Sequence, residues 1–329
     1  MKKESSARIR HSWPAFAALA AAILFWAGVP LLLKVFTHRL DAWTVNGVRY
    51  VFAALFWLPL VLRHRRDVFM SPLAYEPGGG RRVLWRDALV PAVAHVVGQA
   101  LFGLLPYFND ATVINFVSRS GFLFTTLFGF SMLPDERPLA RRPLFWVGFA
   151  GTVAGLITMY KGSLGTATTS AAGMGLLVLT AAFWGLYSVL VRKCMRGYPI
   201  RLGFGLISLY AVPVLLALMF LFGDWRALLH LRLGWWILLW ISAVAGISLG
   251  HVLFYRAIHA LGPITSEGSL LAIPFVTVLL ASFFLDERLR PLQWAGGLLL
   301  IGGCLFLILA KAQVTRDKQD DNPLFSTTD

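Results

Sequence analysis

Five ionisable side chains fall inside long apolar stretches of the sequence: Arg49, His95, Arg119, His251 and Glu267. A charged side chain at the centre of a membrane-spanning helix costs about 2.5–3.5 kcal/mol on insertion scales, so residues kept there commonly serve a function. Uncharged polar side chains accompany them at Gln99, Tyr107 and Asn115. Such a set could bind a small charged solute and carry a proton. No two histidines show the helical spacing of metal ligands, so we expect no metal and no cofactor.

Arg119 is the strongest candidate for solute binding. We expect it about eight residues into a helix, roughly 12 Å from the helix end at 1.5 Å per residue. Its guanidinium suits bidentate binding of a carboxylate, whereas the alternative is a buried ion pair with Glu267. Arg49 either belongs to the same site or extends towards the membrane interface.

The other candidates each have two open interpretations. Glu267 could carry a proton for coupled transport or act as a static counter-ion, and His251 could titrate or only donate hydrogen bonds. Trp26 and Trp184 could line a cavity or only pack. The predicted substrate-binding residues are Arg119, Arg49, Asn115, Gln99, His95, Tyr107, Trp26 and Trp184, with Glu267 and His251 as proton-coupling candidates.

The composition is that of a membrane protein. The 329 residues are 57% hydrophobic and 14% charged, against roughly 25% charged in an ordinary globular domain. The formal charge of +14 comes from basic residues between apolar runs rather than on one face, which argues against nucleic acid as a partner. The two cysteines, Cys194 and Cys304, lie in different apolar runs and imply no disulfide framework.

A helix crossing the bilayer needs about 20 apolar residues. The sequence therefore predicts an all-α integral membrane protein with ten transmembrane helices, over residues 14–35, 43–62, 87–106, 111–132, 143–160, 172–191, 202–222, 234–254, 263–284 and 292–311. Most Lys and Arg residues fall in the segments on one side, which places both termini in the cytoplasm. Paired glycines, Gly151 with Gly155 and Gly246 with Gly250, predict close helix contacts.

One phrase occurs twice. Residues 135–148 read DERPLARRPLFWVG and residues 286–296 read DERLRPLQWAG. A weaker echo relates the Phe–Trp pairs at 25–26 and 183–184. We therefore expect two five-helix repeats, over 14–160 and 172–311, followed by a disordered cytoplasmic tail over 312–329. Five is an odd number of spans, so the repeats would be inverted, an arrangement that suits alternating access in a carrier.

At these residues the sequence resembles the drug/metabolite transporter superfamily, in its EamA-like ten-helix branch. The resemblance covers roughly residues 14–311 and rests on Arg49 in the second span, Pro274 in the ninth and Glu287 after it. The first half departs from the pattern, because Leu123 replaces the expected proline and Arg119 lies just before it. The resemblance implies secondary transport of small metabolites, often outward, without ATP.

We expect a secondary transporter of a small anionic or zwitterionic metabolite, working as an exporter in the cytoplasmic membrane. Its partners would be the solute, the lipid bilayer and a coupling proton or counter-substrate, and it would be a monomer or homodimer. The alternative is an integral-membrane enzyme acting on lipids, which needs a cluster of acids, histidines or metal ligands near one interface. Asp135 and Glu136 are predicted on the opposite face from Asp286 and Glu287, so we do not expect an enzyme.

Overall fold

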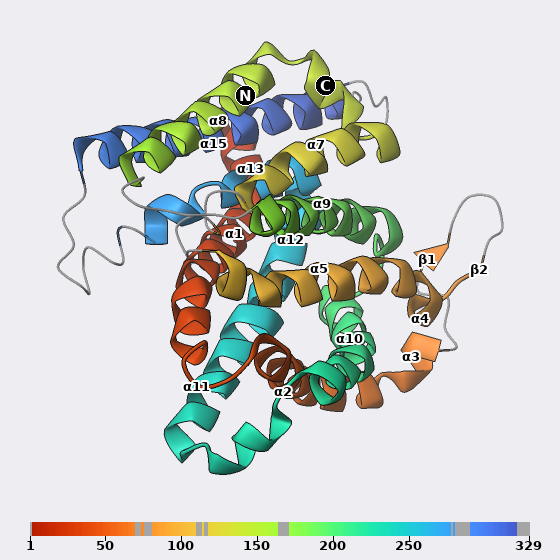
Figure 1. Ribbon diagram of the computed structural model, residues 1–329. Coiled ribbons are helices and arrows are strands. Elements are labelled where there is room, and N and C mark those ends of the chain that lie inside the picture. Colours follow the sequence, from red (N-terminus) through yellow and green to blue (C-terminus); the bar gives the residue numbers. More distant parts are fainter. Residues whose placement is uncertain are drawn as a thin grey trace.

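Within its described residues the protein consists of helices, the turns that join them and one small hairpin. The computed structural model describes residues 2–69, 74–75, 81–109, 114, 118–163, 171–277, 279 and 290–320. Two short strands, β1 (Ala74–Tyr75) and β2 (Arg81–Arg82), pair antiparallel. In Figure 1 the helices α8 and α15 lie side by side at one end of the molecule, and α11 lies at the other end.

The described α-helices are α1 (Lys2–Phe36), α2 (Ala42–Arg63), α3 (Arg65–Phe69), α4 (Leu84–Asp87), α5 (Leu89–Phe108), α7 (Gly121–Met132), α8 (Pro143–Ser163), α9 (Ala171–Cys194), α10 (Ile200–Phe222), α11 (Leu233–Ala243), α12 (Gly250–Leu261), α13 (Pro263–Leu270) and α15 (Pro291–Asp320). Three 3₁₀ turns join them: η1 (Ser118–Ser120), η2 (Arg137–Arg141) and η3 (Trp225–His230). A π-helical turn, η4 (Val244–Leu249), makes α11, η4 and α12 one continuous helical segment.

Within the described residues, six helical segments are long and apolar enough to cross a membrane. They are Ala42–Arg63, Leu84–Phe108, Ala171–Cys194, Ile200–Phe222, Leu233–Leu261 and Trp294–Asp317. They coincide with the predicted second, third, sixth, seventh, eighth and tenth spans. The first and fifth appear as shorter apolar stretches, Pro14–Val29 and Pro143–Thr158. The structure thus supports a membrane protein without establishing ten spans.

The predicted ninth span is wrong as one continuous helix. α13 ends at Leu270, Leu271 and Ala272 form a turn, and residues 273–277 are helical again. Pro274 explains the break, because its ring nitrogen has no hydrogen to donate to the carbonyl of Leu270 four residues earlier. The amides of Leu271 and Ala272 bond three residues back instead, to Gly268 and Ser269.

The fourth span also differs from its prediction. Arg119 lies in the 3₁₀ turn η1, directly before α7, rather than well inside a regular helix. Serine on both sides of Arg119, with Gly121 after it, lowers the helix preference at this point. Asn115 lies outside the described residues.

The predicted tail begins too early. α15 continues as a helix to Asp320, so residues 312–320 are helical rather than disordered. Arg142, the residue before α8, forms an ion pair with Asp317 of α15. Lys311 of α15 pairs with Glu136 at 2.8 Å. These contacts with the first half of the chain hold the extra turns. Residues 321–329 lie outside the described part of the chain.

The paired glycines lie where helices approach closely, as predicted. A Cβ on Gly155 would stand 2.7 Å from the Leu300 amide nitrogen of α15. A Cβ on Gly246 would meet Val29 of α1 at 2.7 Å, and one on Gly250 would meet Trp26 at 2.6 Å. The close contacts between α8 and α15 and between α1 and η4 therefore depend on glycine having no side chain at these positions.

Candidate functional site

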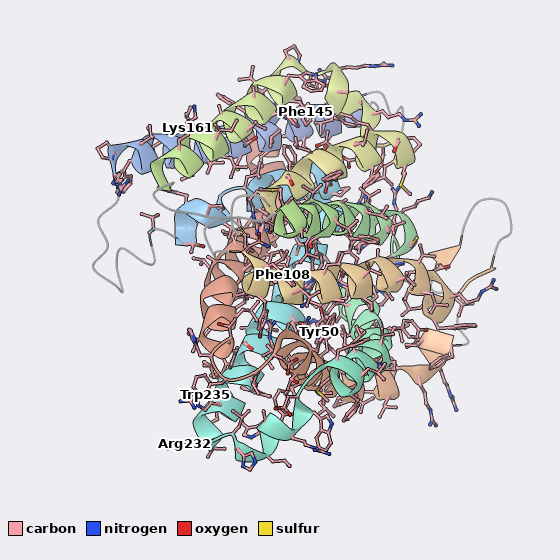
Figure 2. All side chains as sticks on the ribbon, in the orientation of Figure 1. Tyr50, Phe108, Phe145, Lys161, Arg232 and Trp235 are labelled. Atoms are coloured by element: carbon pink, nitrogen blue, oxygen red, sulfur yellow. The ribbon has the colours of Figure 1, made fainter. Side chains whose placement is uncertain are left out.

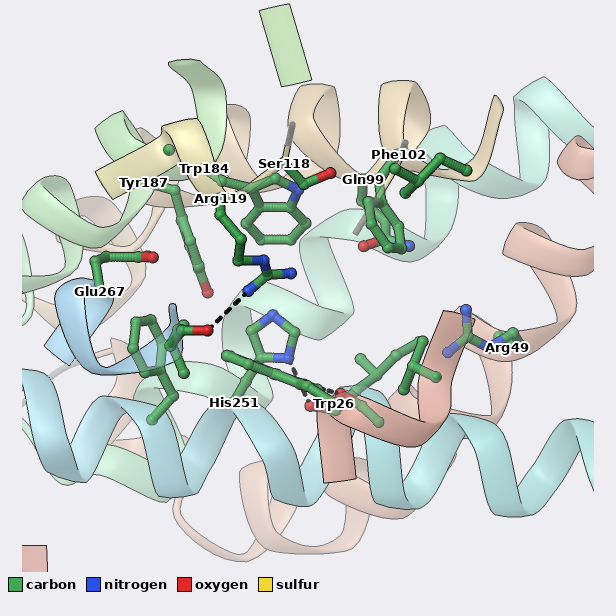
Figure 3. Close-up of a pocket in the computed structure, with 17 residues that line it drawn as sticks. Trp26, Arg49, Gln99, Phe102, Ser118, Arg119, Trp184, Tyr187, His251 and Glu267 are labelled. Carbon is green, nitrogen blue, oxygen red and sulfur yellow. Dashed lines mark hydrogen bonds between the residues drawn. The ribbon is translucent and has the colours of Figure 1, made fainter. Parts of the chain in front are cut away.

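A cavity of about 120 Å³ lies between the helices, lined by residues of α1, α2, α5, α7, α9, α12, α13 and the turns η1 and η4. Figure 3 shows the side chains that face it. Most of the predicted site residues line this cavity: Trp26, Arg49, Gln99, Arg119, Trp184, His251 and Glu267. The structure therefore brings together residues spread over more than two hundred positions of the sequence.

Arg49 is held inside the protein. Its side chain is 2% exposed, with Nε donating to Ser242 Oγ at 3.0 Å and Nη2 donating to the Ser242 carbonyl at 3.2 Å. Extension towards the membrane interface, one of the two interpretations left open by the sequence, is therefore wrong. Arg49 contributes a fixed positive charge at one end of the cavity in Figure 3.

Arg119 reaches the broken part of the ninth span. Its Nη1 donates to the Leu270 carbonyl at 3.5 Å. Pro274 leaves that carbonyl without its helical partner, so a residue from the first half of the chain caps a helix end in the second half. The dashed line at Arg119 in Figure 3 marks this contact, and the guanidinium lies beside the cavity.

Glu267 lies on the cavity wall on the same side as Tyr187 in Figure 3. Ser188 of α9 donates its hydroxyl hydrogen to Glu267 Oε1. Tyr187, which also lines the cavity, has its hydroxyl hydrogen-bonded to that of Tyr255 at 2.5 Å. Helix α9 thus contacts α13 through Ser188 and α12 through Tyr187 at the cavity wall.

Aromatic side chains form the remaining walls. Trp26 Nε1 donates to the Gly246 carbonyl at 2.8 Å, a carbonyl of the π-helical turn. Its ring centroid is 5.1 Å from that of His251, and Phe204 stacks on His251 at 4.8 Å. His251 Nδ1 donates to the Ile247 carbonyl at 2.9 Å, which leaves Nε2 as the ring nitrogen able to take up a proton.

Two predicted residues within the described part of the chain do not line the cavity. His95 is fully buried behind it, with Nε2 hydrogen-bonded to the Tyr50 hydroxyl at 2.7 Å and its ring 5.2 Å from that of His251. Tyr107 is 41% exposed and donates its hydroxyl hydrogen to the Leu40 carbonyl, so it does not line the cavity. Its placement in the site is not borne out by the geometry. Asn115 lies outside the described residues.

Sequence reasoning missed several lining residues. Phe102, Phe254 and Tyr187 are uncharged aromatic side chains in apolar runs, and nothing in the sequence separates them from packing residues. Ser188 is not among the lining residues but donates to Glu267. It carried a weak signal, because it lies four residues after Trp184, on the same face of one helix.

The first copy of the repeated phrase forms an ionic cluster. Arg192 of α9 bridges Asp135 at 3.0 Å and donates to the His259 carbonyl of α12. Glu136, with no exposed side-chain surface, pairs with Lys311. Burial raises the pKa of Glu136, although Lys311 opposes this. Burial alone would also raise the pKa of Asp135, but Arg192 holds that pKa below its usual range.

The side chains lining the cavity offer no metal centre. Within the described ranges, no group of three or more histidine, cysteine, aspartate or glutamate side chains is placed to hold a metal ion. Figure 2 labels Tyr50, which is fully buried, and Trp235 near the tip formed by α11.

Comparison with known proteins adds a fold and a partial family match. No curated protein matches the chain. A crystal structure of a protein matches with a TM-score of 0.72 and 16% identity, covering 91% of this chain and 98% of the other, a likeness that concerns the fold alone. Residues 171–309 match the model of the EamA-like transporter family, which together with the long apolar helices supports an integral membrane transporter of the drug/metabolite transporter superfamily.

Proposed function

We propose that the protein is a secondary transporter that exports a small anionic or zwitterionic metabolite through the cytoplasmic membrane by alternating access, with both termini in the cytoplasm. The observation that carries this proposal is Arg119, a cation beside an internal cavity at the break of a membrane-embedded helix. Broken helices with free carbonyls near the centre of the membrane commonly form the binding sites of secondary carriers.

The positions of the breaks support two related halves. When the two copies of the DER phrase are superposed in sequence, the turn at 271–272 corresponds to residues 120–121, where η1 ends and α7 begins. Both halves are thus interrupted at the same position. Helix contacts follow the same relation, because α1 packs on α12 as α9 packs on α5. An inverted repeat of this kind would let one half rock against the other.

The charges of the cavity favour a solute with a carboxylate. Arg119 and Arg49 supply two guanidinium groups, and Glu267 supplies one acid about the same space. A carboxylate would take the hydrogen bonds of Arg119, and an ammonium group would be attracted to Glu267. A cavity of 120 Å³ has room for only about four water molecules. The solute is therefore small, or the cavity widens when it binds.

Two groups could couple transport to a proton. Glu267 is an acid on the cavity wall, and His251 presents one ring nitrogen with a free lone pair. If Glu267 binds the proton, Glu267→Gln in proteoliposomes should abolish solute movement driven by a pH gradient while leaving exchange of solute for solute. Loss of both kinds of movement would instead assign Glu267 to solute binding.

The first test compares culture media by untargeted mass spectrometry. Cells producing the wild-type protein should release a carboxylate-bearing compound that cells producing Arg119→Ala do not. Arg226→Ala is the matched control, because Arg226 is exposed and lies outside the cavity. Protein levels in the membrane must be equal. Media that do not differ between wild type and Arg119→Ala would refute an anion exporter that uses Arg119.

A further inference from the structure

A second hollow, which we call the arginine groove, lies outside the cavity described above. It has a volume of about 840 Å³ and is lined by α1, α2, α10, η4 and α12. Its lining residues are Phe25, Phe56, Trp57, Pro59, Leu60, Arg63, Ile200, Arg201, Leu249, Val252, Leu253 and Arg256. None of them lines the cavity that holds Arg119, so the two hollows are separate.

The groove has a cationic end and an apolar length. Arg63 is the last residue of α2, Arg201 lies in the first turn of α10, and Arg256 lies in the second half of α12. All three side chains are exposed. Among the apolar lining residues, Phe56 precedes Arg63 on α2 and Leu253 precedes Arg256 on α12, so apolar side chains continue along both helices away from their arginines.

The charge at this end is not balanced within the groove. No acidic residue is among those that line it. No ion pair or hydrogen bond of the three arginine side chains is found among the described residues. The α10 helix adds to the positive potential, because its N-terminus lies here and Pro199, the residue before it, makes no side-chain cap. A helix N-terminus carries about half a positive charge and favours an anion.

We propose that the arginine groove binds an anionic phospholipid, with the phosphate held by Arg63, Arg201 and Arg256 and an acyl chain lying along the apolar side chains. Basic pockets between membrane helices are suited to acidic lipid headgroups. A neutral lipid would leave the three charges uncompensated. A soluble phosphate compound would leave the apolar length of the groove empty. The combination of both features selects a lipid with a negative headgroup.

The test is native mass spectrometry of the full-length protein in detergent, titrated with phosphatidylglycerol, phosphatidylcholine and inorganic phosphate. We expect bound phosphatidylglycerol, little phosphatidylcholine and no retained phosphate. The triple variant R63Q/R201Q/R256Q should bind phosphatidylglycerol about tenfold or more weakly, since each surface cation contributes attraction to acidic lipid. The variant R63K/R201K/R256K should retain most of the binding.

The control variant R141Q/K193Q/R196Q removes the same charge from exposed residues elsewhere and should bind like wild type. Leu249→Trp should also weaken binding, because the larger ring fills the groove without changing charge. Equal phosphatidylglycerol binding by the groove and control triple variants would overturn the proposal. Equal binding of phosphatidylcholine and phosphatidylglycerol by the wild type would overturn it as well.

Discussion

The contact between α8 and α15 provides a quantitative test of the fold. These are the predicted last helices of the two halves, and they lie side by side (Figure 1). An ideal Cβ on Gly303 would stand 2.6 Å from the Thr152 amide nitrogen and 2.8 Å from the Gly148 carbonyl oxygen. Both are backbone atoms, so they cannot move aside without a shift of the whole of α8. Gly302, the residue before it, has nothing within 4 Å of its own ideal Cβ.

The substitutions Gly302→Ala and Gly303→Ala therefore differ in packing alone. In a helix, alanine is favoured over glycine by about 1 kcal/mol, and this gain applies to both variants. Overpacking costs typically 1–3 kcal/mol, and it applies only at Gly303. The free energy of unfolding of Gly303→Ala should thus be about 1–3 kcal/mol below that of Gly302→Ala, because the propensity gains cancel.

The assay is equilibrium unfolding of the purified proteins in mixed micelles, followed by far-ultraviolet circular dichroism. Gly302→Ala should be as stable as wild type or slightly more stable. A Gly303→Ala variant as stable as Gly302→Ala would show that α8 and α15 are not packed backbone to backbone. The reasoning on the glycine contacts would then be refuted.

Three further predictions concern the ends of helices. Gly262→Ala should lower the free energy of unfolding by about 1–3 kcal/mol, because Gly262 has φ 84° and an added Cβ would meet Glu136 Oε1. Gly28→Ala is the control, because nothing lies within 4 Å of an added Cβ there. Equal free energies of unfolding for the two variants would refute this prediction. Burial raises the pKa of Glu136 above 4.5, so the folded state binds this proton more tightly than the unfolded state does. Proton binding therefore stabilises the folded state at low pH, and this part of the free energy of unfolding is lost as the pH rises above 4.5. Glu136→Gln should flatten that part of the curve of unfolding free energy against pH, and an unchanged slope would contradict it. Asp41→Ala should cost about 1 kcal/mol in thermal unfolding, since Asp41 caps α2 and accepts from the Asp224 amide; no loss would argue against the cap.

The sequence was sufficient to predict a helical membrane protein and the positions of most of its helices. Apolar runs of about 20 residues can bury their backbone groups in lipid only as helices, so composition and length were sufficient. The same reasoning identified Arg49, Arg119, His251 and Glu267, because charges within such runs are costly and therefore few. All four line the cavity.

Only the tertiary structure decided how these residues are used. The uncharged side chains that line the cavity, such as Tyr187 and Phe254, are of the same types as ordinary packing residues. The sequence pattern alone therefore cannot identify them as lining residues. The break after Leu270 was missed because the hydropathy of the ninth span is continuous across it, although Pro274 was visible in the sequence. Whether Arg49 extends to the membrane interface or stays inside the protein depends on Ser242, which lies 193 residues away. A contact across that separation is set by how the helices pack, and local sequence carries no record of it.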